Sequence, residues 1–476
     1  MAQQIKIDVC VIGAGSGGLS VAAGTAQLGL KTILIERNEM GGDCLNTGCV
    51  PSKALLAASK HAQSFRNNNI KGIASIEPEI DFAAVKDHVM DTIKSIEPND
   101  SQERFESLGV KVIRESAKFI SKDIVQAGDF NITSRYFIIA TGSTPVVPPI
   151  SGLDGDKILT NETIFHLREK PDHLLVIGGG PIGIEMAQAH RRLGSQVSIF
   201  DMGMMLPRDD SGNVDVLRKT LEKENINIYE NISIKEVAHT PQQITLTIEK
   251  DRKLIEITGS HLLITAGRKP VTDGLDLEKA QVNFNKRGIE VDARLRTNNK
   301  NIFAIGDVAG GPQFTHIAGY HAGIVIRNIC FKIPAKVNYQ ALPWVTYTDP
   351  ELAQVGMTEQ TARNQYGDDI KIVESLYEEN DRAISERNTT GRLRVITTKR
   401  GRILGASMVG HQAGDLIGIW GLAISSKLKI GAIAGMISPY PSLSEINKRA
   451  AGAWYTPRLF SKRTREFVKL LQLLPF

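Results

Sequence analysis

The chain has 476 residues, of which 42% are hydrophobic and 23% charged, a composition typical of a globular protein with about two to four domains. Its formal net charge of +5 is too small to favour nucleic-acid binding, and no apolar run approaches the ~18 residues of a membrane span. The polar start, residues 1–6, resembles no signal sequence, so we expect a cytoplasmic protein. Of the four cysteines, Cys10 and Cys330 are expected to be small core residues.

The first expected elements are a strand over residues 7–12, a glycine-rich loop, a helix to residue 28 and a strand over residues 31–35. This order predicts a dinucleotide site, in which the helix N-terminus holds the pyrophosphate. Glycines in a G-x-G-x-x-G pattern would allow the tight turn, the close approach of the backbone and close helix packing. They are Gly13, Gly15 and Gly18. Glu36, 18 residues past the last of them, is placed to bond a ribose hydroxyl.

Two cysteines, Cys44 and Cys49, follow this unit closely. A close pair in a chain with so few cysteines indicates redox catalysis, and a disulfide here could receive electrons from a bound flavin. Residues 52–60 are expected to form a helix with Pro51 in its first turn, which places Cys49 near a helix N-terminus that favours a thiolate. We expect Cys44 in an irregular, glycine-rich turn, because residues five apart on a helix do not face each other. The alternative is two unrelated buried thiols.

The dinucleotide pattern recurs in the middle of the chain. A strand over residues 174–177 precedes a second glycine loop, a helix over residues 184–193 and a strand over residues 196–200. The glycines of this loop are Gly178, Gly180 and Gly183. Asp201 again stands 18 residues past the last glycine and favours NAD over NADP, against which Arg208, seven residues on, counts weakly. The alternative is one dinucleotide site and a second loop that binds nothing.

Further strands end in turns at Gly142 and Gly267, and another delivers Asp307 next to a glycine, where it could bond a ribityl chain or act as a helix cap. β-rich segments and then helices follow from about residue 341. We therefore expect an α/β protein with two Rossmann-like dinucleotide-binding domains and a C-terminal α+β domain. The expected ranges are 1–150 for the first domain with the cysteines, 151–270 for the second, 271–340 for a return to the first, and 341–476 for the C-terminal domain.

Together these motifs resemble those of the FAD-dependent pyridine nucleotide–disulfide oxidoreductases, the family of dihydrolipoyl dehydrogenase, glutathione reductase and mercuric reductase. The resemblance covers roughly residues 5–455. Its motifs are the two glycine loops, Cys44-x4-Cys49 with Pro51-Ser52-Lys53, Ala140-Thr141-Gly142, Glu185, Gly306-Asp307 and Pro441-x3-Glu445. It implies FAD at the first loop, a nicotinamide nucleotide at the second, and a homodimer formed through the C-terminal domain.

The resemblance also implies residue roles. Hydride would pass from NAD(P)H to the flavin, whose electrons would reduce the disulfide through Cys49, while Cys44 exchanges with an external substrate. Lys53 and Glu185 would form an ion pair that stabilises negative charge on reduced flavin, although an ordinary buried salt bridge would make the same contact. The other cofactor-binding residues that it implies are Arg37, Gly42, Thr141, Gly142 and Gly267. No metal site is expected.

The chain departs from the family pattern at one position that bears on the electron acceptor. Dithiol-oxidising relatives carry a histidine where this chain has Tyr440, ahead of Glu445. A phenol with a pKa near ~10 takes a thiol proton poorly at neutral pH, so we expect a dihydrolipoyl-dehydrogenase-like flavoenzyme with weak dithiol activity and a small-molecule disulfide, metal-ion or quinone acceptor. The first alternative is a mercuric-reductase-like metal-ion reductase, which Tyr440 fits, although the C-terminal cysteine pair of those enzymes has no counterpart here. The second is a non-catalytic flavin-binding interaction protein.

The C-terminal tail alternates basic and apolar residues. The basic ones are Arg458, Lys462, Arg463, Arg465 and Lys469, and the apolar ones include Phe467, Val468, Leu470, Leu471, Leu473 and Leu474. We expect a helix that packs on the dimer partner, and the alternative is a weak contact with an anionic membrane surface. In either position, the C-terminal domain of one subunit would supply Tyr440 and Glu445 to the disulfide of the other.

Overall fold

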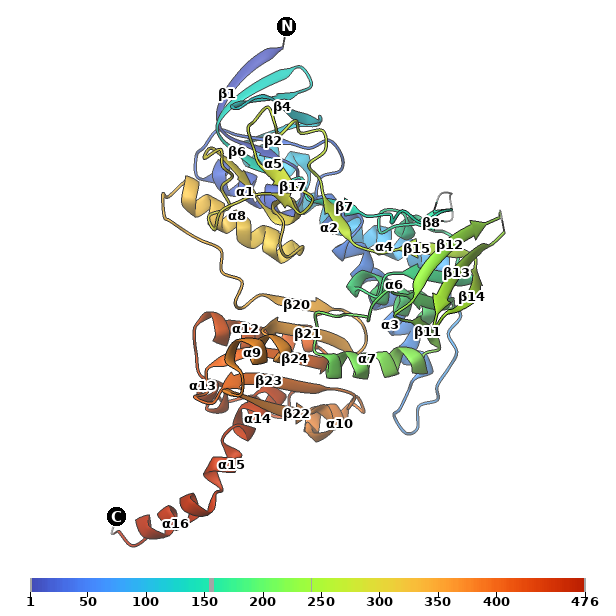
Figure 1. Cartoon of the computed structure of the whole chain (residues 1–476), viewed down its shortest axis with the longest axis vertical. Coiled ribbons are helices and arrows are strands. Elements are labelled where there is room, and N and C mark those ends of the chain that lie inside the picture. Colours follow the sequence, from blue (N-terminus) through green and yellow to red (C-terminus); the bar gives the residue numbers. More distant parts are fainter. Residues whose placement is uncertain (1, 154–157, 241, 475–476) are drawn as a thin grey trace.

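The computed structural model describes residues 2–153, 158–240 and 242–474. Met1, at the polar start, and Pro475 and Phe476, at the end of the basic tail, lie outside these described residues. Figure 1 shows an N-terminal body at the top, a second body beside it, a C-terminal body below, and a helical tail that leaves this last body.

The first body is built on a seven-stranded sheet of order β3-β2-β1-β6-β5-β4, with β19 paired to β6. Its strands are β1 (Gln3–Ile12), β2 (Thr32–Ile35), β3 (Val110–Ile113), β4 (Ala117–Ser121), β5 (Ile124–Ala127), β6 (Phe130–Ile139) and β19 (Ile302–Ala304), beside a small hairpin of β17 (Phe284–Asn285) and β18 (Gly288–Ile289). Its helices are α1 (Ser16–Gln27), α2 (Gly42–Asn46), α3 (Cys49–Arg66), α4 (Phe82–Ile96), α5 (Gln102–Ser107) and α8 (Thr315–Ile329).

The last residues of strand β1 are all apolar, and the packing of the strand explains why. Val9 and Val11 pack into a core with α1 and α8, whereas Cys10 and Ile12 pack into a second core on the opposite face. Alternate side chains are therefore buried on both faces, as is usual for a parallel sheet that is covered on both sides. The predicted first strand–loop–helix–strand unit is confirmed.

The second body holds a parallel five-stranded sheet of order β11-β10-β9-β15-β8. Its strands are β8 (Ile158–Leu159), β9 (His173–Ile177), β10 (Gln196–Phe200), β11 (Ile226–Tyr229) and β15 (His261–Ile264), with an antiparallel meander of β12 (Ser233–His239), β13 (Ile244–Lys250) and β14 (Lys253–Gly259). Its helices are α6 (Pro181–Arg192) and α7 (Ser211–Lys223). Leu55 of α3 and Val89 of α4 share a core with Ile184 of α6, so these two helices join the first body to the second.

The two bodies are also linked by a pair of short crossing strands, β7 (Ser143–Pro145) and β16 (Arg268–Pro270), which pair antiparallel. Each crossing strand follows one of the predicted turn glycines, Gly142 and Gly267. The chain therefore passes twice through the same narrow connection, and the domain ranges proposed from the sequence remain our proposal.

The C-terminal body is an antiparallel sheet of order β20-β21-β24-β23-β22. Its strands are β20 (Pro343–Thr346), β21 (Glu351–Gly356), β22 (Ile370–Leu376), β23 (Arg392–Thr398) and β24 (Ile403–Gly410). Its helices are α9 (Glu359–Tyr366), α10 (Asp381–Ser385), α11 (Ala413–Leu416), α12 (Gly418–Ser425), α13 (Ile430–Ala434) and α14 (Glu445–Ala453), after which come α15 (Thr456–Leu459) and α16 (Lys462–Leu471). Trp420 and Ile446 pack with β-strand residues in its core.

This C-terminal sheet also contacts the second body. Asn213 of α7 donates to the Ser407 hydroxyl at 2.8 Å, and Arg392 of β23 donates to Asn213 at 2.8 Å. The chain is thus an α/β protein with two dinucleotide-binding domains and a C-terminal α+β domain, as predicted. Among the described residues, no helix is long and apolar enough to cross a membrane.

Candidate active site

A cavity of about 2320 Å³ lies where the three bodies meet. It is lined by both glycine loops, both redox cysteines, Lys53, Glu185 and the acidic residues that end the two dinucleotide units. Of the site residues predicted from the sequence, those that do not line it are Gly18, Gly183, Tyr440 and Glu445. The fold therefore gathers most of the predicted site in one place.

The two glycine loops repeat the same backbone geometry. The first glycines, Gly13 and Gly178, have φ values of +104° and +113°, a region that L side chains rarely adopt. A Cβ on Gly18 would lie 1.8 Å from the Gly13 carbonyl oxygen, and one on Gly183 would lie 2.0 Å from the Gly178 oxygen. Gly18 and Gly183 therefore let each helix pack against its own loop, which explains why they do not face the cavity.

The middle glycines have a different reason. Gly15 and Gly180 are the N-caps of α1 and α6, and a Cβ on either would meet no protein atom within 4 Å. Packing within the chain does not require glycine there, whereas a pyrophosphate lying on the helix N-terminus would. The residues present fit a dinucleotide at each loop.

The acidic residues that end the two units are held in matching positions. Glu36 Oε2 accepts the Ala14 N–H at 2.6 Å, and Asp201 Oδ2 accepts the Gly179 N–H at 2.6 Å. The second oxygen of each carboxylate accepts another backbone N–H at 2.7 Å. Both carboxylates are thus fixed by the loop next to them, and Arg37 lines the cavity beside Glu36.

The cysteines are carried by two consecutive helices. Cys49 is the first residue of α3, which confirms that it lies at a helix N-terminus, although the helix begins three residues earlier than the predicted range of 52–60. The expectation that Cys44 lies in an irregular turn is wrong, because it lies in the short helix α2. The chain instead breaks at Thr47 and Gly48, and a Cβ on Gly48 would lie 2.7 Å from the Asp43 carbonyl oxygen. This break between the helices reorients the chain so that the thiols meet.

Two helix N-termini converge on Cys49. The hydroxyl of Thr315, the first residue of α8, lies 3.3 Å from the Cys49 sulfur. A hydrogen bond from the Cys44 thiol, then the Thr315 hydroxyl and the charge of Lys53, lower the pKa of Cys49 to about 6, while the pKa of Cys44 is strongly raised. The structure holds both as free thiols, Cys49 exposed and Cys44 half-buried. Cys49 is therefore suited to be a thiolate at neutral pH.

The predicted contact between Lys53 and Glu185 is present. Lys53 Nζ of α3 lies 2.8 Å from Glu185 Oε2 of α6, and the Glu185 side chain is only 5% exposed. Glu185 Oε1 accepts the Tyr347 N–H at 2.8 Å, and the ammonium lies 4.6 Å from the centre of the Tyr347 ring. The C-terminal body, through Tyr347, thus helps to hold this cation next to the cysteines.

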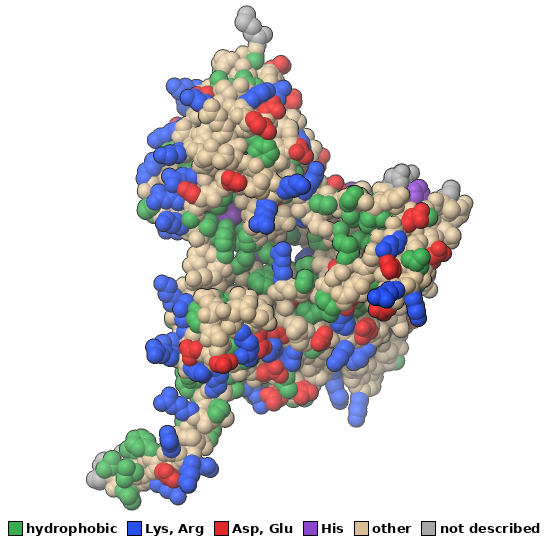
Figure 2. Space-filling view, viewed as in Figure 1, with side chains coloured by type: hydrophobic (Ala, Val, Ile, Leu, Met, Phe, Trp, Pro, Cys, Tyr) green, Lys and Arg blue, Asp and Glu red, His purple; other side chains and the backbone are tan. Residues whose placement is uncertain are grey.

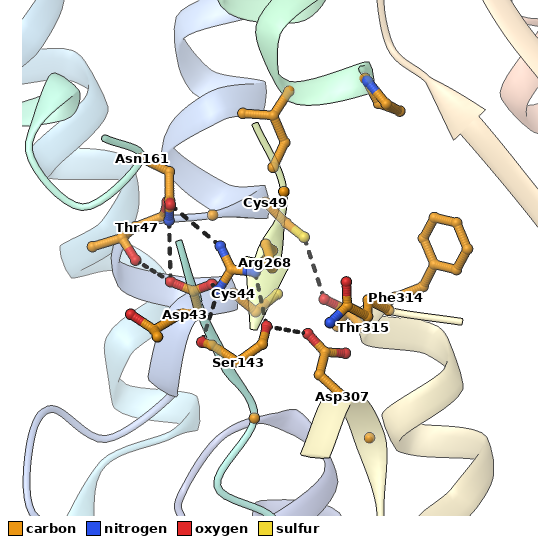
Figure 3. A pocket seen from close by; sticks show the side chains of 18 of the residues that line it. Asp43, Cys44, Thr47, Cys49, Ser143, Asn161, Arg268, Asp307, Phe314 and Thr315 are labelled. Carbon is orange, nitrogen blue, oxygen red and sulfur yellow. Dashed lines mark hydrogen bonds and ion pairs between the residues drawn. The ribbon is translucent and has the colours of Figure 1, made fainter. Parts of the chain in front are cut away.

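Sequence reasoning missed a polar network centred on Arg268, shown in Figure 3. Arg268 pairs with Asp43, donates to Asn161 Oδ1 at 3.2 Å and donates to Ser143 Oγ at 2.8 Å. Ser143 in turn donates to Asp307 Oδ2 at 2.6 Å. The network ties the helix that carries Cys44 to both crossing strands and to Asp307, whose pKa is raised by burial.

Local signals for part of this network existed. Arg268 directly follows the predicted turn glycine Gly267, and Asp43 directly precedes Cys44. The two crossing segments are also joined next to this network, where the Thr141 hydroxyl donates to the Val271 carbonyl at 2.7 Å. Thr315, however, is 266 residues from Cys49, and no motif marked it.

Tyr440 and Glu445 lie near the start of α14, outside the cavity of their own chain. The Tyr440 side chain is 71% exposed, and its hydroxyl donates to Asp381 Oδ2 at 3.0 Å. This hydrogen bond and the charge of Asp381 raise the pKa of the phenol. Asp381, which the sequence analysis did not consider, is thus the carboxylate that Tyr440 contacts.

Two family models match this chain and identify its family. The family model described as pyridine nucleotide-disulphide oxidoreductase matches residues 7–322, and the model of that family's dimerisation domain matches residues 342–451. The chain belongs to the pyridine nucleotide-disulphide oxidoreductase family. It is therefore an FAD-dependent oxidoreductase that uses a pyridine nucleotide, and its dimerisation domain supports a homodimer.

Relatives within the family differ in their acceptors. The chain is 35% identical over 454 residues to a dihydrolipoyl dehydrogenase of Geobacillus stearothermophilus, covering 94% of this chain and 96% of the relative. It is 32% identical over 441 residues to a mercuric reductase of Bacillus cereus, covering 92% and 70%. Among solved structures, the HOCl-induced flavoprotein disulfide reductase RclA of Escherichia coli matches with a TM-score of 0.85 and 28% identity, covering 94% and 99%. The predicted family and enzyme class are confirmed.

Proposed function

We propose that this enzyme takes hydride from NADH and passes two electrons through FAD to the Cys44–Cys49 disulfide, whose reduced form then reduces a disulfide, metal-ion or quinone acceptor, and that it oxidises dithiols poorly. The observation that carries the proposal is the environment of Cys49, which combines a pKa of about 6 with the Lys53–Glu185 pair at the meeting point of two dinucleotide loops. FAD, when bound, would supply the step between hydride transfer and thiol–disulfide chemistry. Gly15 and Gly42 would allow its approach, and Glu36, Arg37, Thr141 and Asp307 would line its site.

The residues around Cys49 have defined tasks in this proposal. Lys53, held by Glu185, places a positive charge that stabilises negative charge developing beside it. The Thr315 hydroxyl donates to the Cys49 thiolate, and Cys44 keeps its proton until it attacks an acceptor. Oxidation of the Cys49 thiolate and the Cys44 thiol to one disulfide releases two electrons and one proton, which balances a two-electron acceptor. Assignment of Cys44 to exchange with substrate rests on the family, since Cys49 is the more exposed here.

NADH is the proposed nucleotide because of Asp201. One oxygen accepts the Gly179 N–H of the second loop at 2.6 Å and the other accepts the Gly203 N–H, just after β10, at 2.7 Å, so the carboxylate is fixed where the adenosine ribose would lie. A fixed negative charge would repel the 2′-phosphate of NADPH. Gly178, Gly180 and Gly267 line the same part of the cavity.

The proposal excludes efficient dithiol oxidation because of Tyr440. A general base for this reaction needs a pKa near neutral pH, and the pKa of the Tyr440 phenol is raised by its bond to Asp381. In the homodimer, Tyr440 and Glu445 of one subunit would lie at the disulfide of the other, where the phenol could donate a hydrogen bond to the acceptor.

A soft metal ion is the second candidate acceptor. Mercuric reductases are among the relatives, and one solved RclA structure is a Cu(II) complex with a TM-score of 0.84 to this chain. Thiolates are the ligands that soft metals prefer, and the Cys44–Cys49 pair supplies two sulfurs. Among the described residues, no group of three or more His, Cys, Asp or Glu side chains could hold a resident metal ion. In this proposal the metal ion is the substrate that is reduced.

The electron stoichiometry tests the central proposal. Anaerobic dithionite titration of the flavin-loaded enzyme should consume about four electrons per subunit, because the flavin and the Cys44–Cys49 disulfide each take up two. The Cys49→Ser variant lacks the disulfide and should consume about two. Equal uptake in both would show that the cysteines exchange no electrons with the flavin. NADH-driven turnover with lipoamide, glutathione disulfide, Hg(II), Cu(II) and quinones would then identify the acceptor. The cytoplasmic location stays a prediction.

A further inference from the structure

The C-terminal tail carries an unpartnered amphipathic helix. α15 and α16 follow α14 and lead away from the C-terminal body in Figure 1, and no residue of either helix is buried. The family's dimerisation model ends at residue 451, before both helices. The tail thus lies beyond the region that the family models match, and no residue of it lines the cavity.

Helix α16 has a clear local start. The Ser461 hydroxyl caps it by accepting the Thr464 N–H at 3.2 Å, and Lys469 stands in its last turn, where a cation is favoured. The helix is therefore encoded by its own residues rather than by contacts with the rest of the described chain. Its surface is available to a partner.

The two faces of α16 differ sharply. Phe467, Leu470, Leu471 and Leu474 follow the i, i+3, i+4, i+7 pattern of one helical face, and each is between 43% and 64% exposed. Lys462, Arg465 and Lys469 occupy the opposite face. In Figure 2, hydrophobic side chains gather toward the far end of the tail, and basic ones lie beside them on the part nearer the C-terminal body.

Charge indicates the partner. From Thr456 to Leu474 the tail carries five basic residues and one acidic residue, Glu466. We propose that α16 binds the surface of an anionic lipid bilayer, lying in its plane with the apolar face at the acyl boundary and the basic residues among the lipid phosphates. Arg463 lies on the apolar face itself, four residues before Phe467, and its side chain is long enough to reach the headgroups. At 10 residues, α16 lies on the bilayer and does not span it.

A second copy of this chain is a poorer partner. Its own α16 would repel a helix of the same charge, and three acidic side chains of the C-terminal body are already engaged by arginines. Glu379 pairs with Arg449 at 3.3 Å and Glu386 with Arg382 at 2.5 Å, while Glu374 lies 3.5 Å from Arg392. Anionic lipid, in contrast, offers both negative charge and an apolar boundary to the two faces of α16.

Vesicle flotation of the full-length flavin-loaded enzyme tests this proposal. The enzyme should float with phosphatidylcholine vesicles that contain phosphatidylglycerol, remain unbound with phosphatidylcholine alone, and lose binding as salt is raised. Leu470→Glu should lower the vesicle partition coefficient about tenfold or more, because it removes apolar burial and adds a repelled charge. Arg465→Glu should also weaken binding.

Leu254→Glu is the matched control, because Leu254 of β14 is 68% exposed and Leu470 is 61% exposed. This control should float like the wild type, and all variants should keep wild-type NADH oxidation with a water-soluble acceptor. Failure of the wild type to float, or equal flotation of Leu470→Glu and Leu254→Glu, would overturn the proposal. If Leu470→Glu instead shifted the monomer–dimer equilibrium in sedimentation while vesicles bound nothing, the occupant would be a second copy and the proposal would be wrong.

Discussion

The Thr315 hydroxyl lies 3.3 Å from the Cys49 sulfur, and each residue is the first of its helix. The N-terminal residues of α3 and α8 are therefore in contact at this thiol, and the charge of Lys53 lowers the pKa of Cys49 further. The thiolate is stabilised from several directions, while the Cys44 thiol keeps its proton and donates to it. This asymmetry between the two sulfurs is what distinguishes the site from a pair of ordinary thiols.

Replacing Thr315 should raise the pKa of Cys49. Thr315→Val removes the hydroxyl but keeps the shape, so the pKa should rise from about 6 by up to about one unit, the effect of losing a hydrogen bond to a charged group. The rate of iodoacetamide alkylation of the reduced enzyme follows the thiolate fraction, and its pH midpoint should move upward. Thr315→Ser should retain the low midpoint. An unchanged midpoint in Thr315→Val would show that the hydroxyl does not lower the pKa of Cys49.

Replacing Asp201 should relax nucleotide choice. The wild type should prefer NADH to NADPH in kcat/KM, and Asp201→Ala should reduce that preference about tenfold, because a fixed charge near the 2′-phosphate is lost. KM for NADH should also rise, since the Gly179 and Gly203 N–H groups lose their acceptor. Asp215→Ala, on the exposed face of α7, is the control. A wild type that prefers NADPH would contradict the proposal of NADH as the nucleotide, and Arg208 would then be the candidate to bind the 2′-phosphate.

Converting Tyr440 to histidine should create dithiol activity. In Tyr440→His an imidazole with a pKa near ~6.5 replaces a phenol whose pKa is raised by Asp381, so dihydrolipoamide oxidation should rise at least about tenfold and increase with pH through ~6.5. Reduction of one-electron acceptors by NADH should change little. Fast dihydrolipoamide turnover by the unmodified enzyme, with a basic limb near neutral pH, would show that another group already serves as the base.

Removing Arg268 should weaken the connection between the cysteine-bearing helix and the crossing strands. Arg268→Ala leaves Asp43 without its cation and Ser143 and Asn161 without a donor, so the free energy of unfolding should fall by about 2–4 kcal/mol. Urea titration with flavin release as the signal measures this loss. Lys269→Ala, at the exposed neighbour, should have little effect, and equal losses in both variants would show that the network contributes nothing specific.

Local sequence was sufficient for most features of the two dinucleotide units. The glycine loops, the carboxylates Glu36 and Asp201, and the position of Cys49 at a helix start follow from strand, turn and helix signals within about 30 residues, because backbone conformation there is set by short-range sterics and hydrogen bonds. The similarity of the two loops, seen first as equal spacing, appears again as matching φ values at Gly13 and Gly178.

Only the tertiary structure decided which distant groups act on the cysteines. Thr315, Arg268 and Tyr347 reach the site from three separate segments, and Asp381 instead of Glu445 contacts Tyr440. The two cysteines do not share one helix, as the spacing argument required, but Cys44 lies in a short helix of its own and not in an irregular turn, because the chain changes direction at Gly48. Such contacts depend on how the bodies pack, and packing is determined by the summed burial of side chains across the whole chain, which no local pattern records.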